Sequence, residues 1–141
     1  MDDSRSVEAV FARKAGPGTY QQTSAFISRT GPWHRSASSK DSGGSSGFTT
    51  SEPATAMMVF EGTGVTWIGR TTQKVGVGRV FIDGVRVADV DGYSASIRYQ
   101  WRLFDSGALE AGQHTIRIQF SGRKRPAAQD NNLVLDALVV P

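Results

Sequence analysis

The side chains with the greatest capacity for specific hydrogen bonds occur in one run, Asp130-Asn131-Asn132, directly before the last apolar stretch of the chain. A carboxylate and two carboxamides can hold adjacent hydroxyl groups of a sugar, and an aromatic ring can pack against its C–H face. Tyr93 and Trp33 are the candidates for that ring, with core packing as the alternative for Trp33. An asparagine before a strand also commonly caps a turn, so binding and capping remain alternatives for the two amides.

Basic residues could add a preference for an acidic sugar such as a uronate, because cationic side chains bind carboxylates. The candidates are Arg98, Arg123 and Lys124. The chain has 16 Lys and Arg against 13 Asp and Glu, a formal charge of +3. Its one tight basic cluster, 123–125, has the composition of a solvated loop, and no nucleic-acid-binding motif accompanies it. We therefore expect no nucleic-acid partner.

Residues that could catalyse a reaction do not form a recognisable constellation. His34 follows a tryptophan and His114 begins a strand-like segment, where a structural hydrogen bond is the usual role. Asp83 and Asp136 lie within strand-like segments, where a hydrogen bond to a nearby loop is favoured over a glycosidase carboxylate pair. The chain has no cysteine and no Gly-x-Ser-x-Gly motif, which excludes thiolate chemistry and a serine-hydrolase elbow. The sequence predicts that the protein is not an enzyme.

Short strands punctuated by glycine must position these residues. Valine occurs 13 times and leucine 5 times, which favours sheet over helix. Strand-like segments are predicted at 24–29, 33–36, 54–60, 65–70, 78–83, 85–90, 98–104, 114–120 and 133–140. Residues 36–51, rich in serine and glycine, are predicted to be one long loop within the domain. This pattern predicts an all-β protein, an antiparallel β-sandwich of jelly-roll type with about eight strands.

The chain of 141 residues is long enough for one domain. Residues 1–22 show no clear period and are interpreted as an N-terminal segment or linker remnant, and 23–141 as the sandwich; Val7, Val10 and Phe11 could form one face of a short helix. No apolar run approaches the length of a membrane span, and none in the first twenty residues suits a signal peptide. The chain is then either intracellular or, as we expect, a piece of a longer exported protein.

Antiparallel succession of the strands distributes the connections between the two ends of the sandwich. One end receives the short turns at 61–64, 84–85 and 105–112. The other receives 36–53, 71–77, 91–97 and 121–132, which include the longest loops. Compact domains rarely keep several long loops at one end unless that end binds something, so we expect the site there. Its polar residues are Lys40, Asp41, Thr72, Gln73, Lys74, Tyr93, Arg98, Arg123, Lys124, Gln129, Asp130, Asn131 and Asn132.

A family resemblance covers about residues 23–141. Its motifs are Phe60-Glu-Gly-Thr-Gly-Val-Thr-Trp-Ile-Gly69, Gly78-Arg-Val-Phe-Ile-Asp-Gly84, Leu103-Phe104-x-x-Gly107, Leu109-x-x-Gly112-x-His114-Thr-Ile-Arg-Ile118 and Leu133-Val-Leu-Asp-Ala137, with Trp33 and Ser42-Gly43-Gly44-Ser45 upstream. In order and spacing the chain resembles the galactose-binding-like jelly-roll modules of bacterial carbohydrate-active enzymes. The resemblance implies a non-catalytic, extracellular or cell-surface module that binds an oligo- or polysaccharide. It also implies that Asn131 or Asn132 contacts sugar.

Some of these families bind calcium, so calcium stays open as a cofactor. Asp89 and Asp91 could ligate it or form a turn, and without a third carboxylate nearby the turn is favoured. An early acidic calcium motif is not evident in Val7-Glu8-Ala9-Val10. The sequence thus predicts a carbohydrate-binding module that targets a larger enzyme or surface protein to a glycan. The alternative is a structural spacer or protein-interaction sandwich without a sugar site.

Overall fold

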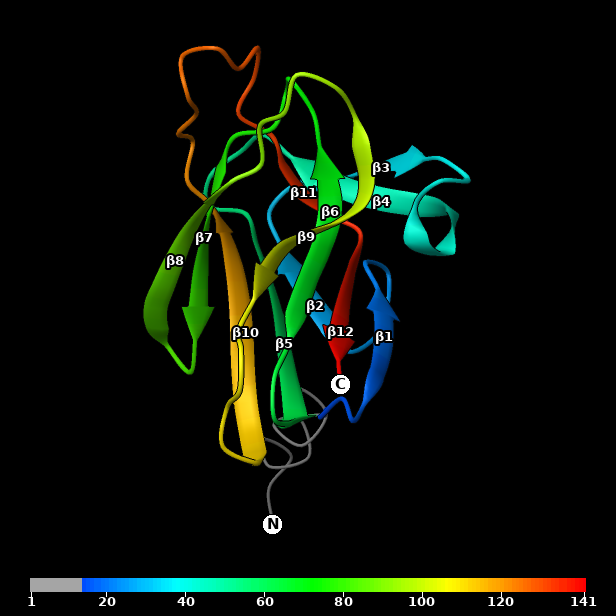
Figure 1. The fold of residues 1–141 in the computed structure, drawn as a ribbon, viewed down its shortest axis with the longest axis vertical. Helices are drawn as coiled ribbons and strands as arrows, with labels where there is room; N and C mark the ends of the chain where they lie inside the picture. Colours follow the sequence, from blue (N-terminus) through cyan, green and yellow to red (C-terminus); the bar gives the residue numbers. More distant parts are fainter. Residues whose placement is uncertain (1–13) are drawn as a thin grey trace.

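The glycine-punctuated pattern folds into a β-sandwich, shown by a computed structural model that describes residues 14–141 (Figure 1). Its strands are β1 (Gly18–Gln21), β2 (Ile27–Thr30), β3 (His34–Ala37), β4 (Ser45–Thr49), β5 (Thr55–Gly62), β6 (Thr66–Thr71), β7 (Val77–Ile82), β8 (Val85–Asp91), β9 (Arg98–Asp105), β10 (Gly112–Phe120), β11 (Leu133–Leu135) and β12 (Ala137–Val140). A single turn of 3₁₀ helix, η1 (Ser42–Gly44), lies between β3 and β4. The predicted all-β jelly-roll class is confirmed.

The strands form three sheets, and the paired strands are antiparallel. One sheet has the order β1-β12-β6-β9, a second the order β2-β5-β10-β7-β8, and a small third sheet the order β11-β4-β3. Alternation decides which side chains face the core: in β10, Ile116, Ile118 and Phe120 are buried, as the sequence predicts. Residues 14–141 contain no helix long and apolar enough to cross a membrane.

The three tryptophans have different environments. Trp67 is buried in the core, and its indole Nε1 donates to the carbonyl of Val134 at 3.0 Å. Gly78 makes room for this ring, since a Cβ at that position would lie 2.9 Å from it. Trp33 packs against the edge of the core, whereas Trp101, on the edge strand β9, is 42% exposed. Trp67 therefore belongs to the core, whereas Trp101 lies at the exposed edge of its sheet.

The sandwich includes a strand that the sequence pattern did not indicate. β1 lies before residue 23, where the predicted domain begins, and pairs with β12, Gly18 opposite Val140. Its sequence, Gly-Thr-Tyr-Gln, has one large apolar side chain and no alternation, so the pairing of its backbone with β12 defines it as a strand. Residues 1–13, with the helix considered for Val7, Val10 and Phe11, lie outside the described part of the chain.

The serine-rich segment is also more regular than expected, and the interpretation of 36–51 as one loop is wrong. β3 extends to Ala37, η1 follows, and β4 occupies Ser45–Thr49. Small side chains allow β4 to pack closely: a Cβ on Gly47 would lie 2.8 Å from the side-chain oxygen of Gln22. Composition hid this strand because serine and glycine usually indicate loops.

The long connections lie together at one end of the sandwich. Figure 1 shows the segments 71–77, 91–97 and 121–132 at the upper end, with β3 and β4 beside them. Isolated parallel bridges join them: Thr72 pairs with Tyr93, and Val75 pairs with Asn132. The arrangement expected from antiparallel succession is therefore present, and it positions the site.

Candidate functional site

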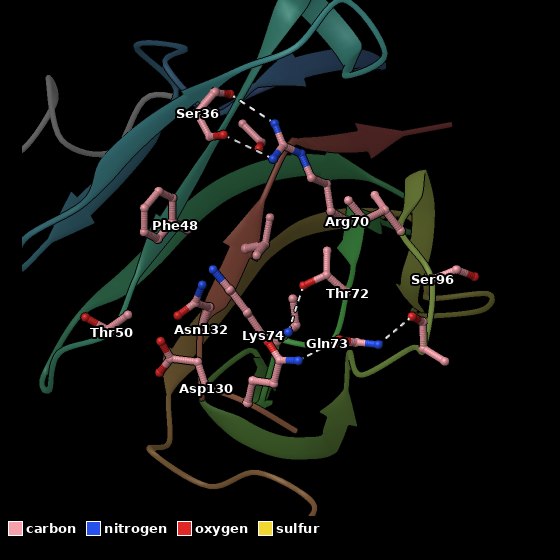
Figure 2. A pocket seen from close by; sticks show the side chains of 16 residues that line it. Ser36, Phe48, Thr50, Arg70, Thr72, Gln73, Lys74, Ser96, Asp130 and Asn132 are labelled. Atoms are coloured by element: carbon pink, nitrogen blue, oxygen red, sulfur yellow. Dashed lines mark hydrogen bonds between the residues drawn. The ribbon is translucent and has the colours of Figure 1, made fainter. Parts of the chain in front are cut away.

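A pocket of about 670 Å³ opens where the long connections meet (Figure 2). Each of the four segments predicted to gather at this end contributes side chains. The lining residues are Ser36, Ser46, Phe48, Thr50, Arg70, Thr72, Gln73, Lys74, Val75, Ala95, Ser96, Ile97, Gln129, Asp130, Asn132 and Val134. Segments far apart in the sequence therefore form one concave surface.

The connection that follows β6 organises the pocket. Backbone hydrogen bonds tie it to the segment before β11, from Gln129 N to Gln73 O at 2.7 Å and from Asn132 N to Lys74 O at 2.9 Å. The side-chain amide of Gln73 donates to the carbonyl of Ala95 at 2.9 Å. Three loops are thus held to one another by direct hydrogen bonds, which fixes the shape of the pocket.

Gly76 lies where these loops approach one another closely. A Cβ at this position would lie 2.5 Å from the carbonyl oxygen of Arg123 and 2.8 Å from the Cα of Asn131. Its N–H donates to the carbonyl of Asn132 at 2.8 Å, and its carbonyl accepts from the N–H of Gly92 at 3.0 Å. Only a residue without a side chain fits here while the backbones make these bonds.

Arg70 forms a wall of the pocket and is fixed in place. Its Nε donates to Asp41 Oδ1 at 2.9 Å and its Nη2 to Asp41 Oδ2 at 2.5 Å, while Nη1 donates to Ser36 Oγ at 3.1 Å. The hydrogen bonds to Asp41, whose side chain is fully buried, raise the pKa of Arg70 above its usual value. Arg70 therefore ties β6 to the segment after β3 as a permanent cation.

Asp136 lies in this polar region, between β11 and β12, and is completely buried. Its Oδ2 accepts a hydrogen bond from Ser42 N at 2.8 Å, and its Oδ1 has no partner among the described residues. Burial raises the pKa of this carboxyl to about 6, with Asp41 adding to the rise and the Ser42 hydrogen bond and the charge of Arg70 opposing it. Asp136 contributes to the support of η1 rather than to the pocket surface.

Several polar groups in the pocket have no partner among residues 14–141. Ser46 Oγ and Asn132 Oδ1 are buried without a hydrogen bond, and the ammonium group of Lys74 makes no hydrogen bond or ion pair with a described residue. Figure 2 shows Lys74 and Asn132 directed into the pocket on the side of Phe48. A phenyl ring, two unused hydrogen-bonding oxygens and a cation can together hold a small ligand with an apolar face, hydroxyl groups and an acidic substituent.

Of the residues predicted to bind, the structure brings Asp130 and Asn132 to the pocket. Asn131 does not line it; its Nδ2 donates to the carbonyl of Gly122 at 3.3 Å, which is a capping role. Lys124 lies outside the lining as well, and its Nζ donates to the carbonyl of Ala128 at 3.0 Å. Of the two roles considered for the asparagines, Asn132 lies where it could bind a ligand and Asn131 caps a turn.

The other predicted residues also lie outside the lining. Tyr93 is half-buried under the guanidinium of Arg125, 4.8 Å from its ring centroid. Arg98 donates from Nε to a threonine hydroxyl and stacks on Trp101, with Cζ 3.9 Å from the ring centroid. Trp33 donates from its indole to a carbonyl in the adjacent turn, and Arg123 is exposed. These side chains pack around the loops rather than into the pocket.

Two lining residues outside the predicted polar set are central to the pocket. Phe48 provides its aromatic surface but lies in the serine-rich segment that was expected to be loop. Ser46 precedes it by two residues on the same strand face, as strand alternation requires. The alternation of Ser46, Phe48 and Thr50 toward one side is the signal that could have indicated them.

Acidic residues considered for catalysis or calcium have structural partners. Asp91 accepts from the N–H of Tyr93 at 3.0 Å and from Arg125 at 2.8 Å, the pattern of a turn. Asp83 lies in the turn between β7 and β8, and its Oδ2 is 2.7 Å from Nδ1 of His114 on β10. Within the described part of the chain, no group of three or more His, Cys, Asp or Glu side chains is arranged to hold a metal ion.

Comparison with known proteins gives relatives in carbohydrate chemistry. No protein-family model matches the chain. It is 32% identical over 89 residues to the A type blood N-acetyl-alpha-D-galactosamine deacetylase of Flavonifractor plautii, a match that covers 63% of this chain and 11% of the deacetylase. The chain therefore spans about a tenth of that relative's length.

Solved structures show the same fold. A family 35 carbohydrate-binding module from Clostridium thermocellum matches with a TM-score of 0.58 and 15% identity, over 86% of this chain and 96% of the module. The xanthan lyase of Paenibacillus matches with a TM-score of 0.61 and 17% identity, over 88% of this chain and 13% of the lyase. These matches support the predicted resemblance to galactose-binding-like carbohydrate-binding modules.

Proposed function

We propose that this chain is a non-catalytic carbohydrate-binding module whose glycan binds in the pocket between β4 and the connections 71–77, 91–97 and 121–132. The observation that carries this proposal is the combination of Phe48 with the unpartnered Asn132 Oδ1, Ser46 Oγ and Lys74 ammonium in one concave surface. Buried polar atoms without partners are uncommon in folded proteins and need an explanation. Both oxygens are covered by neighbouring atoms, so a sugar hydroxyl group donates to them only when those neighbours move aside on binding.

Each lining group has a defined role in this proposal. The phenyl ring of Phe48 packs against the C–H face of a sugar ring, while Asn132 and Asp130 bind its hydroxyl groups. Lys74 gives the pocket a preference for an acidic sugar, the role expected earlier of Arg98, Arg123 and Lys124. Asp130 is the one carboxylate among the described lining residues. Most glycosidases use a pair of carboxylates, so we propose binding without hydrolysis.

The proposed module acts as an accessory domain of a longer, exported or cell-surface protein. The match to about a tenth of the Flavonifractor plautii deacetylase supports this, because such a share suits one domain of a larger chain. Its task is to tether a larger enzyme or surface protein to its glycan. Folding of the sandwich requires no metal in this proposal; calcium dependence of binding is the alternative, and addition of a chelator distinguishes the two.

A structural spacer or protein-interaction sandwich is the second candidate. A spacer would fill the space between its loops with its own side chains, whereas here the loops enclose a pocket of about 670 Å³. We therefore favour glycan binding. Failure of the chain to bind any glycan would favour the spacer.

The experiment is calorimetric titration with neutral, amino and acidic oligosaccharides, after a glycan array has selected them. We expect weak binding, roughly micromolar to millimolar, because a short sugar buries little surface. Asn132→Ala should raise Kd about five- to tenfold, since each lost hydrogen bond contributes about 1 kcal/mol. Asn131→Ala is the matched control, because its amide binds the carbonyl of Gly122 outside the pocket. Equal affinities of the Asn132→Ala variant and the wild type would contradict the site.

The acidic preference has its own variant. Lys74→Met removes the ammonium but keeps most of the apolar stem, so affinity should fall for uronate-containing ligands and remain for neutral ones. A matching loss for both classes would show that Lys74 shapes the pocket and does not select charge.

A further inference from the structure

The outer face of the five-stranded sheet carries two arginines that have no polar partner. Arg79 on β7 and Arg117 on β10 are half-buried, and the Nε atoms of both are buried without a hydrogen bond. Neither guanidinium makes an ion pair with a described residue. The flanking residues Val80, Ile116 and Ile118 face the core, so strand alternation places both arginines on the opposite side.

The carboxylates of this face are already neutralised by other cations. Asp89 lies opposite Arg79 in the strand register, yet it accepts both of its side-chain bonds from Arg86, at 3.0 and 2.5 Å. The remaining ion pairs are Asp91–Arg125 at 2.8 Å and Glu61–Lys14 at 3.2 Å. Within residues 14–141 the face therefore presents two guanidinium groups without an ion pair, and Arg79 has only a longer-range attraction to Asp89.

Apolar surface lies in the same row of the sheet. The strand register places Met57, Arg117 and Phe81 side by side on β5, β10 and β7. The Cζ atom of Arg117 lies 4.1 Å from the ring centroid of Phe81, and Met57 is 38% exposed. The guanidinium of Arg117 thus lies between the apolar side chains of Met57 and Phe81. This arrangement suits a ligand that carries both a negative charge and C–H groups.

We propose that this face is a second, shallow binding surface for an anionic polysaccharide, whose carboxylate or sulfate groups contact Arg79 and Arg117. The two residues are diagonal neighbours on adjacent strands, with Cα atoms roughly 7–8 Å apart. A single exposed ion pair contributes little, so a polymer that reaches both guanidinium groups is the ligand this spacing favours. Sugar rings between the anionic groups pack on Phe81 and Met57.

This surface is distinct from the pocket. None of Met57, Arg79, Phe81 or Arg117 lines the pocket, whose lining comes from the loops and from β3, β4, β6 and β11. The inference therefore does not rest on the proposed function of the pocket, and variants of the two surfaces can fail independently. Binding at both would allow one module to contact a charged polymer at two places.

The test measures binding of the whole chain to polygalacturonate, which carries carboxylates, and to dextran sulfate, with neutral dextran as the uncharged reference. Arg79→Gln/Arg117→Gln should raise Kd for at least one polyanion about tenfold. Arg35→Gln/Arg102→Gln is the control with the same change in net charge, at two exposed arginines on the other two sheets. A Kd that changes less than about twofold in this control would show that position matters rather than total charge.

The two anionic polymers distinguish the source of the charge. Loss of binding to polygalacturonate alone assigns the face to carboxylates, and loss for dextran sulfate alone assigns it to sulfate esters. Both measurements are repeated in a Lys74→Ala/Asn132→Ala background, where the pocket is impaired and the effect of the sheet arginines should persist. Equal losses in both arginine variants would overturn the proposal. So would tighter binding to a DNA duplex than to either polysaccharide.

Discussion

Asp136→Asn should stabilise the protein at neutral pH, because the carboxylate is buried and one of its oxygens has no partner. Burial raises the pKa of this group from 3.8 to about 6. The difference corresponds to about 3 kcal/mol of unfolding free energy, at about 1.36 kcal/mol for each pH unit. The wild-type protein bears this cost whenever the group is ionised, and an asparagine does not.

The sign of the pH dependence follows from the proton balance. A carboxyl with a higher pKa in the folded protein binds more protons when folded than when unfolded. Its contribution to the unfolding free energy therefore falls as the pH rises from about 4 to about 6, and the full loss is present at higher pH. The asparagine amide can still accept from Ser42 N, and any cost of its NH₂ group is the same at every pH.

The assay is urea unfolding of both proteins at pH 4 and pH 8, followed by tryptophan fluorescence, to which the buried Trp67 contributes. The difference in unfolding free energy, variant minus wild type, should be about 2.5 kcal/mol larger at pH 8 than at pH 4. Parallel pH curves for the wild type and Asp136→Asn would refute the reasoning.

Two further changes test features far from each other. Gly76→Ala should lower the unfolding free energy by about 1–3 kcal/mol, since its Cβ would overlap a backbone oxygen, whereas Gly16→Ala, with open space around it, should be neutral in the same denaturation assay. The pKa of His114 is raised by its hydrogen bond to the Glu110 carbonyl and then by Asp83. The charged imidazolium therefore stabilises the folded protein fully below about pH 6.5, the usual pKa of histidine, and this stabilisation is lost as the pH rises through the higher pKa of the folded state. NMR titration should show this pKa falling in Asp83→Asn, and an unchanged value would contradict the role of the carboxylate.

Alternating β-branched and aliphatic residues made most of the strands predictable. The segment 114–120 alternates, and its apolar positions are buried as expected. β4 escaped detection because its burial depends on the smallness of Ser45, Ser46 and Gly47, and small polar residues carry no hydrophobic period. β1 was missed for a related reason: its position is set by pairing with a strand at the far end of the chain.

The location of the pocket was predictable, but its lining was only partly so. Antiparallel succession alone gathers the long connections at one end, and the pocket lies among them. Which side chain points inward depends on contacts between loops that are distant in sequence. Asn131 and Asn132 are adjacent and chemically identical, yet one caps Gly122 and the other lines the pocket. No local pattern separates them.

The pairing of β1 with β12 has a consequence for how such a domain can be joined to others. Gly18 and Val140 lie opposite each other in the register, at the end of the sandwich away from the loops (Figure 1). The start of β1 and the end of β12 are therefore neighbouring points, separated by roughly the 5 Å spacing of paired strands. A sandwich with this geometry can be inserted into a surface turn of a host protein, or circularly permuted by a short linker, while its pocket faces outward.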